Sequence, residues 1–144
     1  MRSVRTIAAA LLGASALAGV AMPAAAQAPG EASAVRAVEC DRDCLIGMVN
    51  AHMRALSGRD PSALPLASDV MFTENNVVIP VGQGLWRTVT AVDATGLEAA
   101  DETTGQAAWF GSVRENGEPA IYAVRIHVEN GLIDEIETVV HRRT

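Results

Sequence analysis

The sequence predicts an α+β domain in which one long helix is followed by a bent antiparallel sheet. Apolar residues recur at helical spacing in one segment, residues 45–56. From residue 70 the pattern changes to strand-like runs, and two Asn-Gly pairs separate the last three of these runs. A chain of 144 residues is expected to contain one domain of this kind.

The composition excludes several classes of function. All 11 basic residues are arginine and there are 17 acidic residues, so the net charge of -6 argues against a nucleic-acid partner. The absence of lysine excludes Schiff-base chemistry through a lysine. The sequence has no glycine-rich phosphate loop, nucleophile-elbow serine or His-Glu-x-x-His motif, and we expect neither a cofactor nor a metal.

Residues 1–26 have the pattern of a secretory signal peptide. Arg2 and Arg5 precede an apolar stretch of small residues that ends in Ala24-Ala25-Ala26, so cleavage is expected after Ala26. The alternative is an uncleaved membrane anchor, but the apolar run barely reaches membrane-spanning length. We therefore expect an exported protein, periplasmic or extracellular, with no membrane partner after cleavage. Residues 27–39 are expected to form a flexible leader before a domain at residues 40–144.

Cys40 and Cys44 are the two cysteines of the chain. An even number of cysteines in an exported protein favours a disulfide, which could close if Cys40 lies just before the start of a helix. A free pair and a redox-active pair are the alternatives. The redox interpretation is disfavoured because three residues, not two, separate the cysteines.

The expected helix begins near Asp41 or Asp43, either of which can cap it, and Gly58 provides a stop. His52 lies on its apolar stripe. A buried histidine bonded to a neighbour is the preferred interpretation, and a catalytic histidine is the alternative.

Residues 60–67 are expected to form a short connecting turn. The runs 70–74 and 77–81 then flank Asn75-Asn76, a pair suited to a tight hairpin. Pro80 has no amide proton, so its strand should lie at an edge or end early.

The remaining chain is expected to form most of the sheet. Residues 87–104 are ambiguous between helix and strand. Three strands follow at residues 107–114, 120–128 and 132–140, joined by turns at Asn116-Gly117 and Asn130-Gly131.

The helix, the segment DVMFTEN at residues 69–75 and the closing segment NGLIDEIE at residues 130–137 resemble a SnoaL-like domain. This group belongs to the nuclear-transport-factor-two-like superfamily, and the resemblance covers about residues 40–141. With its signal peptide and paired cysteines, the chain looks most like the small secreted branch without assigned function. The resemblance implies a cone with an internal pocket that binds a small, partly apolar molecule, and a homodimer.

Relatives in this superfamily include isomerases, cyclases, dehydratases and lyases as well as non-catalytic binding modules. The resemblance therefore implies either cofactor-free acid–base chemistry beside a carbonyl or a non-catalytic, dimeric ligand-binding or protein-interaction module. The ketosteroid isomerase pattern does not match the chain. The dehydratase residue types are present in His52, His127, Asp93 and Tyr122, without matching positions.

Two registers are open for the last hairpin. A two-residue turn pairs Ile126 with Glu135 and places two carboxylates beside Tyr122 on an apolar face. A bulged turn pairs Ile126 with Asp134 instead, and it groups Arg125, His127, Glu135 and Glu137 on one face. The second register is preferred because it separates polar from apolar residues better.

Glu137 is the first candidate for a general acid or base because it is a candidate in both registers. Arg125 or Tyr122 would stabilise negative charge, and His127 is a further catalytic candidate. A solvated ion pair is the alternative role of Glu137, and a salt bridge that of His127. The candidates for substrate binding are Glu135, Glu74, Trp86 and Trp109; turn solvation is the alternative for Glu74 and core packing for the tryptophans.

Overall fold

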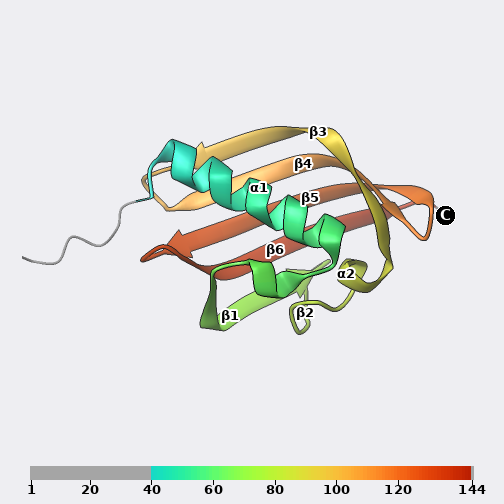
Figure 1. The fold of residues 1–144 in the computed structure, drawn as a ribbon, viewed down its shortest axis with the longest axis horizontal. Helices are drawn as coiled ribbons and strands as arrows, with labels where there is room; N and C mark the ends of the chain where they lie inside the picture. The colour runs from blue at the N-terminus through green and yellow to red at the C-terminus, as the bar shows by residue number, and fades with distance from the viewer. Residues whose placement is uncertain (1–39, 144) are drawn as a thin grey trace, which may run out of the picture. The chain divides into compact units, whose positions relative to one another are not determined.

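The computed structural model describes residues 40–143, so the predicted signal peptide and leader, residues 1–26 and 27–39, lie outside the described residues. Helix α1 (Arg42–Gly58) lies across one face of a six-stranded sheet with the order β2-β1-β6-β5-β4-β3 (Figure 1). The strands are β1 (Leu66–Glu74), β2 (Val77–Val78), β3 (Val89–Asp101), β4 (Gln106–Glu115), β5 (Glu118–Glu129) and β6 (Leu132–Arg142). A 3-10 helix (Pro61–Ala63) and a short α2 (Leu85–Thr88) complete the fold. The predicted α+β class is confirmed.

The sheet is mixed, which corrects the prediction that it is antiparallel. Strand β1 pairs with β6 in parallel, whereas all other neighbours are antiparallel. The antiparallel pairs are joined by short turns that fix their direction locally. No short turn links β1 to β6, so no local signal sets the direction of this pair. None of the described helices is long and apolar enough to cross a membrane.

Helix α1 begins and ends through specific backbone contacts. Asp41 is its N-cap and accepts a hydrogen bond from the amide of Cys44 at 2.9 Å. Cys40 and Cys44 form a disulfide around this cap, as predicted. At the other end the left-handed residue is Arg59 (φ 55°), and Gly58 is still helical, so the predicted stop is one residue early.

Asparagine supplies the positive φ angles of the three hairpins. Asn75 and Asn76 have φ values of 51° and 65°, and Asn116 and Asn130 precede glycines that are also positive. All three predicted turns are confirmed. Strand β2 lies at an edge of the sheet and ends two residues before Pro80, as expected for a residue without an amide proton.

The last hairpin combines features of both predicted registers. Its two-residue turn pairs Val128 with Ile133, but a bulge at Asp134 then shifts the pairing so that Ile126 lies opposite Ile136. Neither predicted pairing of Ile126 is therefore correct. The bulge allows a tight Asn-Gly turn while keeping the carboxylates of β6 out of the core.

The core lies between α1 and the face of the sheet that α1 covers, which we call the helix face. Phe72, Trp109, Tyr122, Ile126 and Ile136 are buried there. The opposite side, the outer face, carries the residues that alternate with these along β4, β5 and β6. This division determines which candidate residues can share a site.

Candidate functional site

Trp109 lies where the sheet bends. Strand β3 carries a bulge between Val92 and Gly96, and Gly96 then pairs with Gly111 of β4. The indole of Trp109 covers both glycines, because a Cβ added to either would overlap its ring atoms. The two glycines thus form a flat platform that only residues without a side chain can provide.

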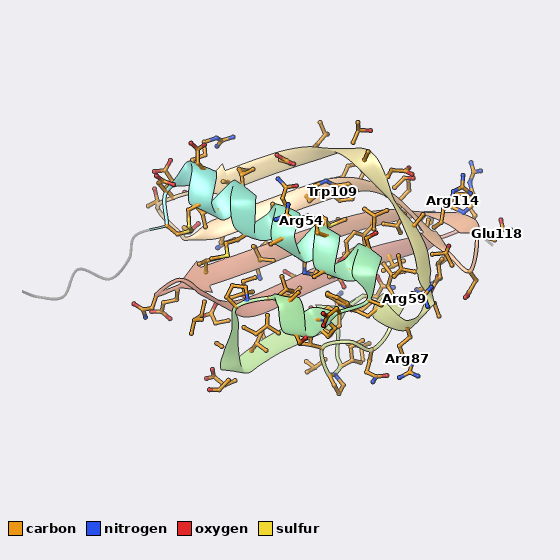
Figure 2. All side chains as sticks on the ribbon, in the orientation of Figure 1. Arg54, Arg59, Arg87, Trp109, Arg114 and Glu118 are labelled. Atoms are coloured by element: carbon orange, nitrogen blue, oxygen red, sulfur yellow. A yellow bond between two sulfur atoms is a disulfide. The ribbon has the colours of Figure 1, made fainter. Side chains whose placement is uncertain are left out.

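A groove with a volume of about 250 Å³ lies in front of Trp109, between α1 and the bent part of β3. Helix α1 contributes Asn50, Met53, Arg54 and Ser57, whose spacing places them on one face of the helix. Figure 2 shows Arg54 on α1 and Trp109 on β4 at this groove. The sheet side of the groove is completed by Val92, Asp93, Ala94 and Glu98.

A buried polar cluster lies behind Trp109. The ring centroid of Tyr122 is 6.3 Å from that of Trp109, and its hydroxyl shares a hydrogen bond of 2.9 Å with Nε2 of His52. Trp86 of α2 meets the ring of His52 edge-on at a centroid distance of 5.4 Å. His52, Trp86 and Tyr122 are at most 2% exposed, so this cluster is part of the core.

Burial keeps the cluster uncharged. Desolvation lowers the pKa of His52 from 6.5 to about 4, so the imidazole is neutral at pH 7. Desolvation, with a smaller contribution from the charge of Glu74, raises the pKa of Tyr122 above its ordinary value. Both groups can therefore exchange hydrogen bonds at neutral pH without carrying a charge.

Two polar atoms of the cluster have no hydrogen-bond partner in the described part of the chain. They are Nδ1 of His52 and Nε1 of Trp86, both buried. Buried polar atoms in native proteins are nearly always bonded, because an unbonded one loses the hydration it had in water. The interior of the domain thus has hydrogen-bonding capacity that its own residues leave unused.

Most of the charged residues predicted for the site lie elsewhere, on the outer face. Arg125 binds Glu135 at 2.8 Å and Glu137 at 3.0 Å, and His127 lies 2.6 Å from Asp134. The side chain of Glu137 is 45% exposed. These residues form partly exposed ion pairs, separated by the sheet from Tyr122, which faces the helix.

The remaining predicted residues are placed as follows. Glu74 is mostly buried, accepts a hydrogen bond from the amide of Leu85 at 2.7 Å and binds Arg142 at 3.1 Å. Arg142 also binds Glu115, and this hydrogen bond lowers the pKa of the Glu115 carboxyl. Glu74 therefore joins α2 to the end of β6. Trp86 and Trp109 are buried, as expected for core or pocket walls.

Substitution of Glu137 should have a small effect. The Glu137→Gln variant loses one partner of an exposed ion pair, and Arg125 keeps Glu135, so we expect the free energy of unfolding to fall by about 0.5 kcal/mol or less. Urea unfolding of both proteins measures this difference. A fall in the free energy of unfolding of about 2 kcal/mol or more would show that Glu137 does not belong to a solvated ion pair.

The candidate residues that the sequence did not indicate are Asn50, Arg54 and Ser57 of the groove. His52 was interpreted mainly as a buried structural residue. The helical spacing of Asn50, Arg54 and Ser57 could have indicated a polar stripe beside the apolar one. The strand that lies opposite this polar stripe could not be predicted, because residues 87–104 show no clear helix or strand pattern. Among residues 40–143 no three His, Cys, Asp or Glu side chains come together as metal ligands.

No family model and no curated protein matches the sequence. Solved structures match the fold. A de novo designed protein with a curved β-sheet has a TM-score of 0.57 at 21% identity, with 69% of this chain and 87% of that chain covered. An NTF2-like protein of unknown function from Burkholderia xenovorans has a TM-score of 0.53 at 15% identity, covering 68% and 83%. Another, from Cytophaga hutchinsonii, has 0.50 at 14% identity, covering 65% and 86%.

These structures define the class of the fold. The chain has an NTF2-like α+β fold, as the resemblance to SnoaL-like domains implied. Identities this low establish the fold alone, so a function has to be argued from the residues of this chain.

Proposed function

We propose that this protein binds a small, partly apolar molecule in the groove in front of Trp109. The observation that carries the proposal is the composition of this groove. Four apolar residues line it, and five polar or charged residues surround them: the apolar ones are Met53, Val92, Ala94 and Trp109, and the others are Asn50, Arg54, Ser57, Asp93 and Glu98. A concave site that combines apolar walls with convergent polar groups is typical of small-molecule binding.

Acid–base chemistry beside a carbonyl is the catalytic form of this function. Glu137 cannot supply it, because this carboxylate lies on the outer face in an ion pair. The remaining candidates are the buried pair of His52 and Tyr122 and the groove carboxylates of Asp93 and Glu98. Burial lowers the pKa of His52 to about 4, so its neutral imidazole is a weak base, and the side chain is fully buried. Binding in the groove does not require a ligand to reach these buried groups, so it is the function we favour.

The test is to block the groove. Acetophenone, which has an apolar ring and one carbonyl, serves as the probe, and binding is followed by the fluorescence of the two tryptophans. Ser57→Phe should fill the groove and reduce the affinity about tenfold or more. Ser68→Phe, at an exposed serine of β1 outside the groove, should not change it. Equal affinities of the two variants would contradict the proposal.

A dimeric interaction module is the second candidate, favoured by an apolar row on the outer face. Leu97, Phe110, Ala123 and Val139 are cross-strand neighbours on β3 to β6, and the three larger side chains are 50–73% exposed. Contiguous apolar surface of this kind is typical of interaction sites.

A second copy of the chain is the partner that fits this row. Glu135 and Glu137 lie along β6 on one side of the row, where Arg125 pairs with both and leaves a net negative charge, and His141 and Arg143 lie on the other. A two-fold axis along the row would place the acidic side of one copy opposite the basic side of the other. Phe110→Arg should therefore shift a dimer to monomer in analytical ultracentrifugation. Leu132→Arg, at an exposed leucine beside a turn, is the control. A wild-type protein that stays monomeric at high micromolar concentration would contradict this candidate.

We also propose that the protein is exported and cleaved after Ala26. The positive start, the apolar stretch and the Ala-x-Ala site support this, and the Cys40–Cys44 disulfide fits an oxidising compartment. Mass spectrometry of the exported protein should find Gln27 as the first residue. Recovery of the full chain from membranes would contradict it.

A further inference from the structure

Two hairpin turns of this protein share the local sequence Glu-Asn-Gly. Asn116-Gly117 joins β4 to β5, and Asn130-Gly131 joins β5 to β6, at the opposite end of the sheet (Figure 1). The backbones of the two turns also match: the φ angles are 51° and 88° in the first turn and 52° and 78° in the second. A difference in the chemistry of the two asparagines would therefore come mainly from the contacts that each turn makes.

An asparagine that precedes a glycine can modify itself. The backbone nitrogen of the glycine loses its proton and bonds to Cγ of the asparagine, and the Cγ–Nδ2 bond breaks so that ammonia leaves with this proton. Water then opens the resulting succinimide ring at either carbonyl carbon, which yields aspartate or isoaspartate. Glycine favours the ring because it has no side chain to obstruct the attack. Ring closure requires the backbone to rotate, so a turn that is held by hydrogen bonds has to open first.

The first turn is held closed by contacts with other parts of the chain. The N–H of Asn116 donates a hydrogen bond to the carbonyl oxygen of Thr88 at 2.8 Å. The N–H of Gly117 carries the attacking nitrogen, and it donates to Oγ1 of Thr90 at 3.0 Å. The carbonyl oxygen of Gly117 accepts a hydrogen bond from Arg114 at 3.1 Å. These contacts oppose both the opening of the turn and the release of the proton.

The second turn lacks such contacts. Within residues 40–143, neither Asn130 nor Gly131 forms a hydrogen bond with a segment outside its own hairpin. Asn130 is also exposed, so water can reach the ring once it has formed. This turn can open without breaking contacts to the rest of the domain.

The remaining asparagines are less suited to the reaction. The side-chain amide of Asn75 is fixed, because its Nδ2 donates to the carbonyl oxygen of Val140 at 3.2 Å and its Oδ1 accepts from the N–H of Val140 at 2.9 Å. Asn50 lies within α1, and Asn76 precedes a valine, so neither is followed by glycine.

We propose that Asn130 is a site of spontaneous deamidation in the folded protein, and that the contacts of the first turn protect Asn116 from the same reaction. The product carries a carboxylate at residue 130, next to Glu129. In the isoaspartate form the backbone of a two-residue turn is longer by one carbon atom, which loosens the adjacent pairing of Val128 with Ile133. The inference is independent of the proposed function, because residue 130 lies outside the groove.

The experiment compares the two asparagines within one molecule. The folded mature chain is kept in mildly alkaline buffer and then digested with trypsin at mildly acidic pH. Trypsin cleaves after arginine, so Asn116 is found in residues 115–125 and Asn130 in residues 126–142. Mass spectrometry detects the exchange of NH2 for OH in each peptide. Residues 126–142 should react roughly tenfold faster or more, because hydrogen bonds hold the first turn.

The unfolded chain provides the reference. In concentrated urea both peptides should be modified at similar rates, because each asparagine then lies in the same Glu-Asn-Gly sequence. The ratio of the two rates in the folded protein, divided by the ratio in urea, gives the protection that the structure provides.

A variant tests the cause of the protection. Thr90→Val keeps the shape of the side chain but removes the oxygen that accepts from the N–H of Gly117. The rate at Asn116 should rise about threefold to tenfold, and the rate at Asn130 should not change. Thr104→Val is the matched control, because it removes an exposed hydroxyl that donates to Asp101. This control should leave both rates unchanged.

The results that would overturn the inference are distinct. Equal rates at the two asparagines in the folded protein would show that the contacts of the first turn do not protect it. An unmodified Asn130, under conditions in which the chain in urea reacts, would show that the second turn is closed as firmly as the first. An unchanged rate at Asn116 in Thr90→Val would show that the hydrogen bond to Thr90 is not the source of the protection.

Discussion

The free energy of unfolding should fall by roughly 3 kcal/mol between pH 6.5 and pH 4 because of His52 alone. In the unfolded chain the imidazole takes up a proton as the pH falls through 6.5, whereas burial lowers the pKa of the folded state to about 4. The unfolded state therefore binds more protons throughout this window, and stability decreases as the pH falls. Well above pH 6.5 both states are neutral and the pH dependence due to His52 vanishes.

The His52→Gln variant isolates this effect. Glutamine can replace the hydrogen bond to Tyr122 but does not titrate, so the variant should lack this part of the pH dependence. Urea unfolding at intervals from pH 7.5 to pH 4 gives both stability curves. Between pH 6.5 and pH 4, the free energy of unfolding of the variant should fall by roughly 3 kcal/mol less than that of the wild type. His141→Gln, at an exposed histidine, is the control for loss of an imidazole. Parallel curves for wild type and His52→Gln would show that His52 is not buried in its neutral form.

Gly96→Ala should destabilise the domain by about 2 kcal/mol, because the new methyl group would overlap the indole of Trp109. The indole can escape only by leaving its platform, which opens the floor of the groove. Chemical denaturation measures the cost, and the fluorescence of Trp109 should shift toward that of an exposed indole. Gly111→Ala should act in the same direction, since its Cβ would also meet the indole.

Two controls separate this overlap from a general effect of alanine. Gly47 of α1 has no atom within 4 Å of an added Cβ, so Gly47→Ala should stabilise the helix by about 0.5–1 kcal/mol. In a Trp109→Ala background, Gly96→Ala should cost little, because the overlapping ring is gone. If Gly96→Ala lowers the free energy of unfolding as much in that background as in the wild type, the indole of Trp109 does not lie on Gly96.

The local elements could be predicted from sequence because their signals are local. The cap at Asp41, the asparagine-containing turns and Pro80 each act within a few residues of their own position. The parallel pairing of β1 with β6 has no such signal, since the two strands are far apart in the chain. The bulge at Asp134 could not be predicted for a related reason. The turn favours one register and the apolar pattern another, and the bulge satisfies both.

The candidate site was predicted only in part. Tyr122, Trp86 and Trp109 were chosen as residues of a pocket, and they are the ones on the helix face. Both predicted registers make Glu137 a candidate, and one of them groups it with Arg125 and His127, but the structure places all three in ion pairs on the outer face. The groove requires a polar stripe of α1 opposite an irregular part of β3. Only the tertiary structure shows that these two segments meet.

The proposed binding groove in front of Trp109 is tested most directly by locating where a small molecule binds. In a two-dimensional ¹H–¹⁵N spectrum of the mature protein, addition of acetophenone should shift the indole N–H of Trp109 and the amides of Asn50, Ser57 and Glu98, all at the groove. Shifts confined to Phe110, Ile121 and Val139 on the outer face would contradict the account. That result would instead favour an interaction module that binds its partner through the apolar row of the outer face.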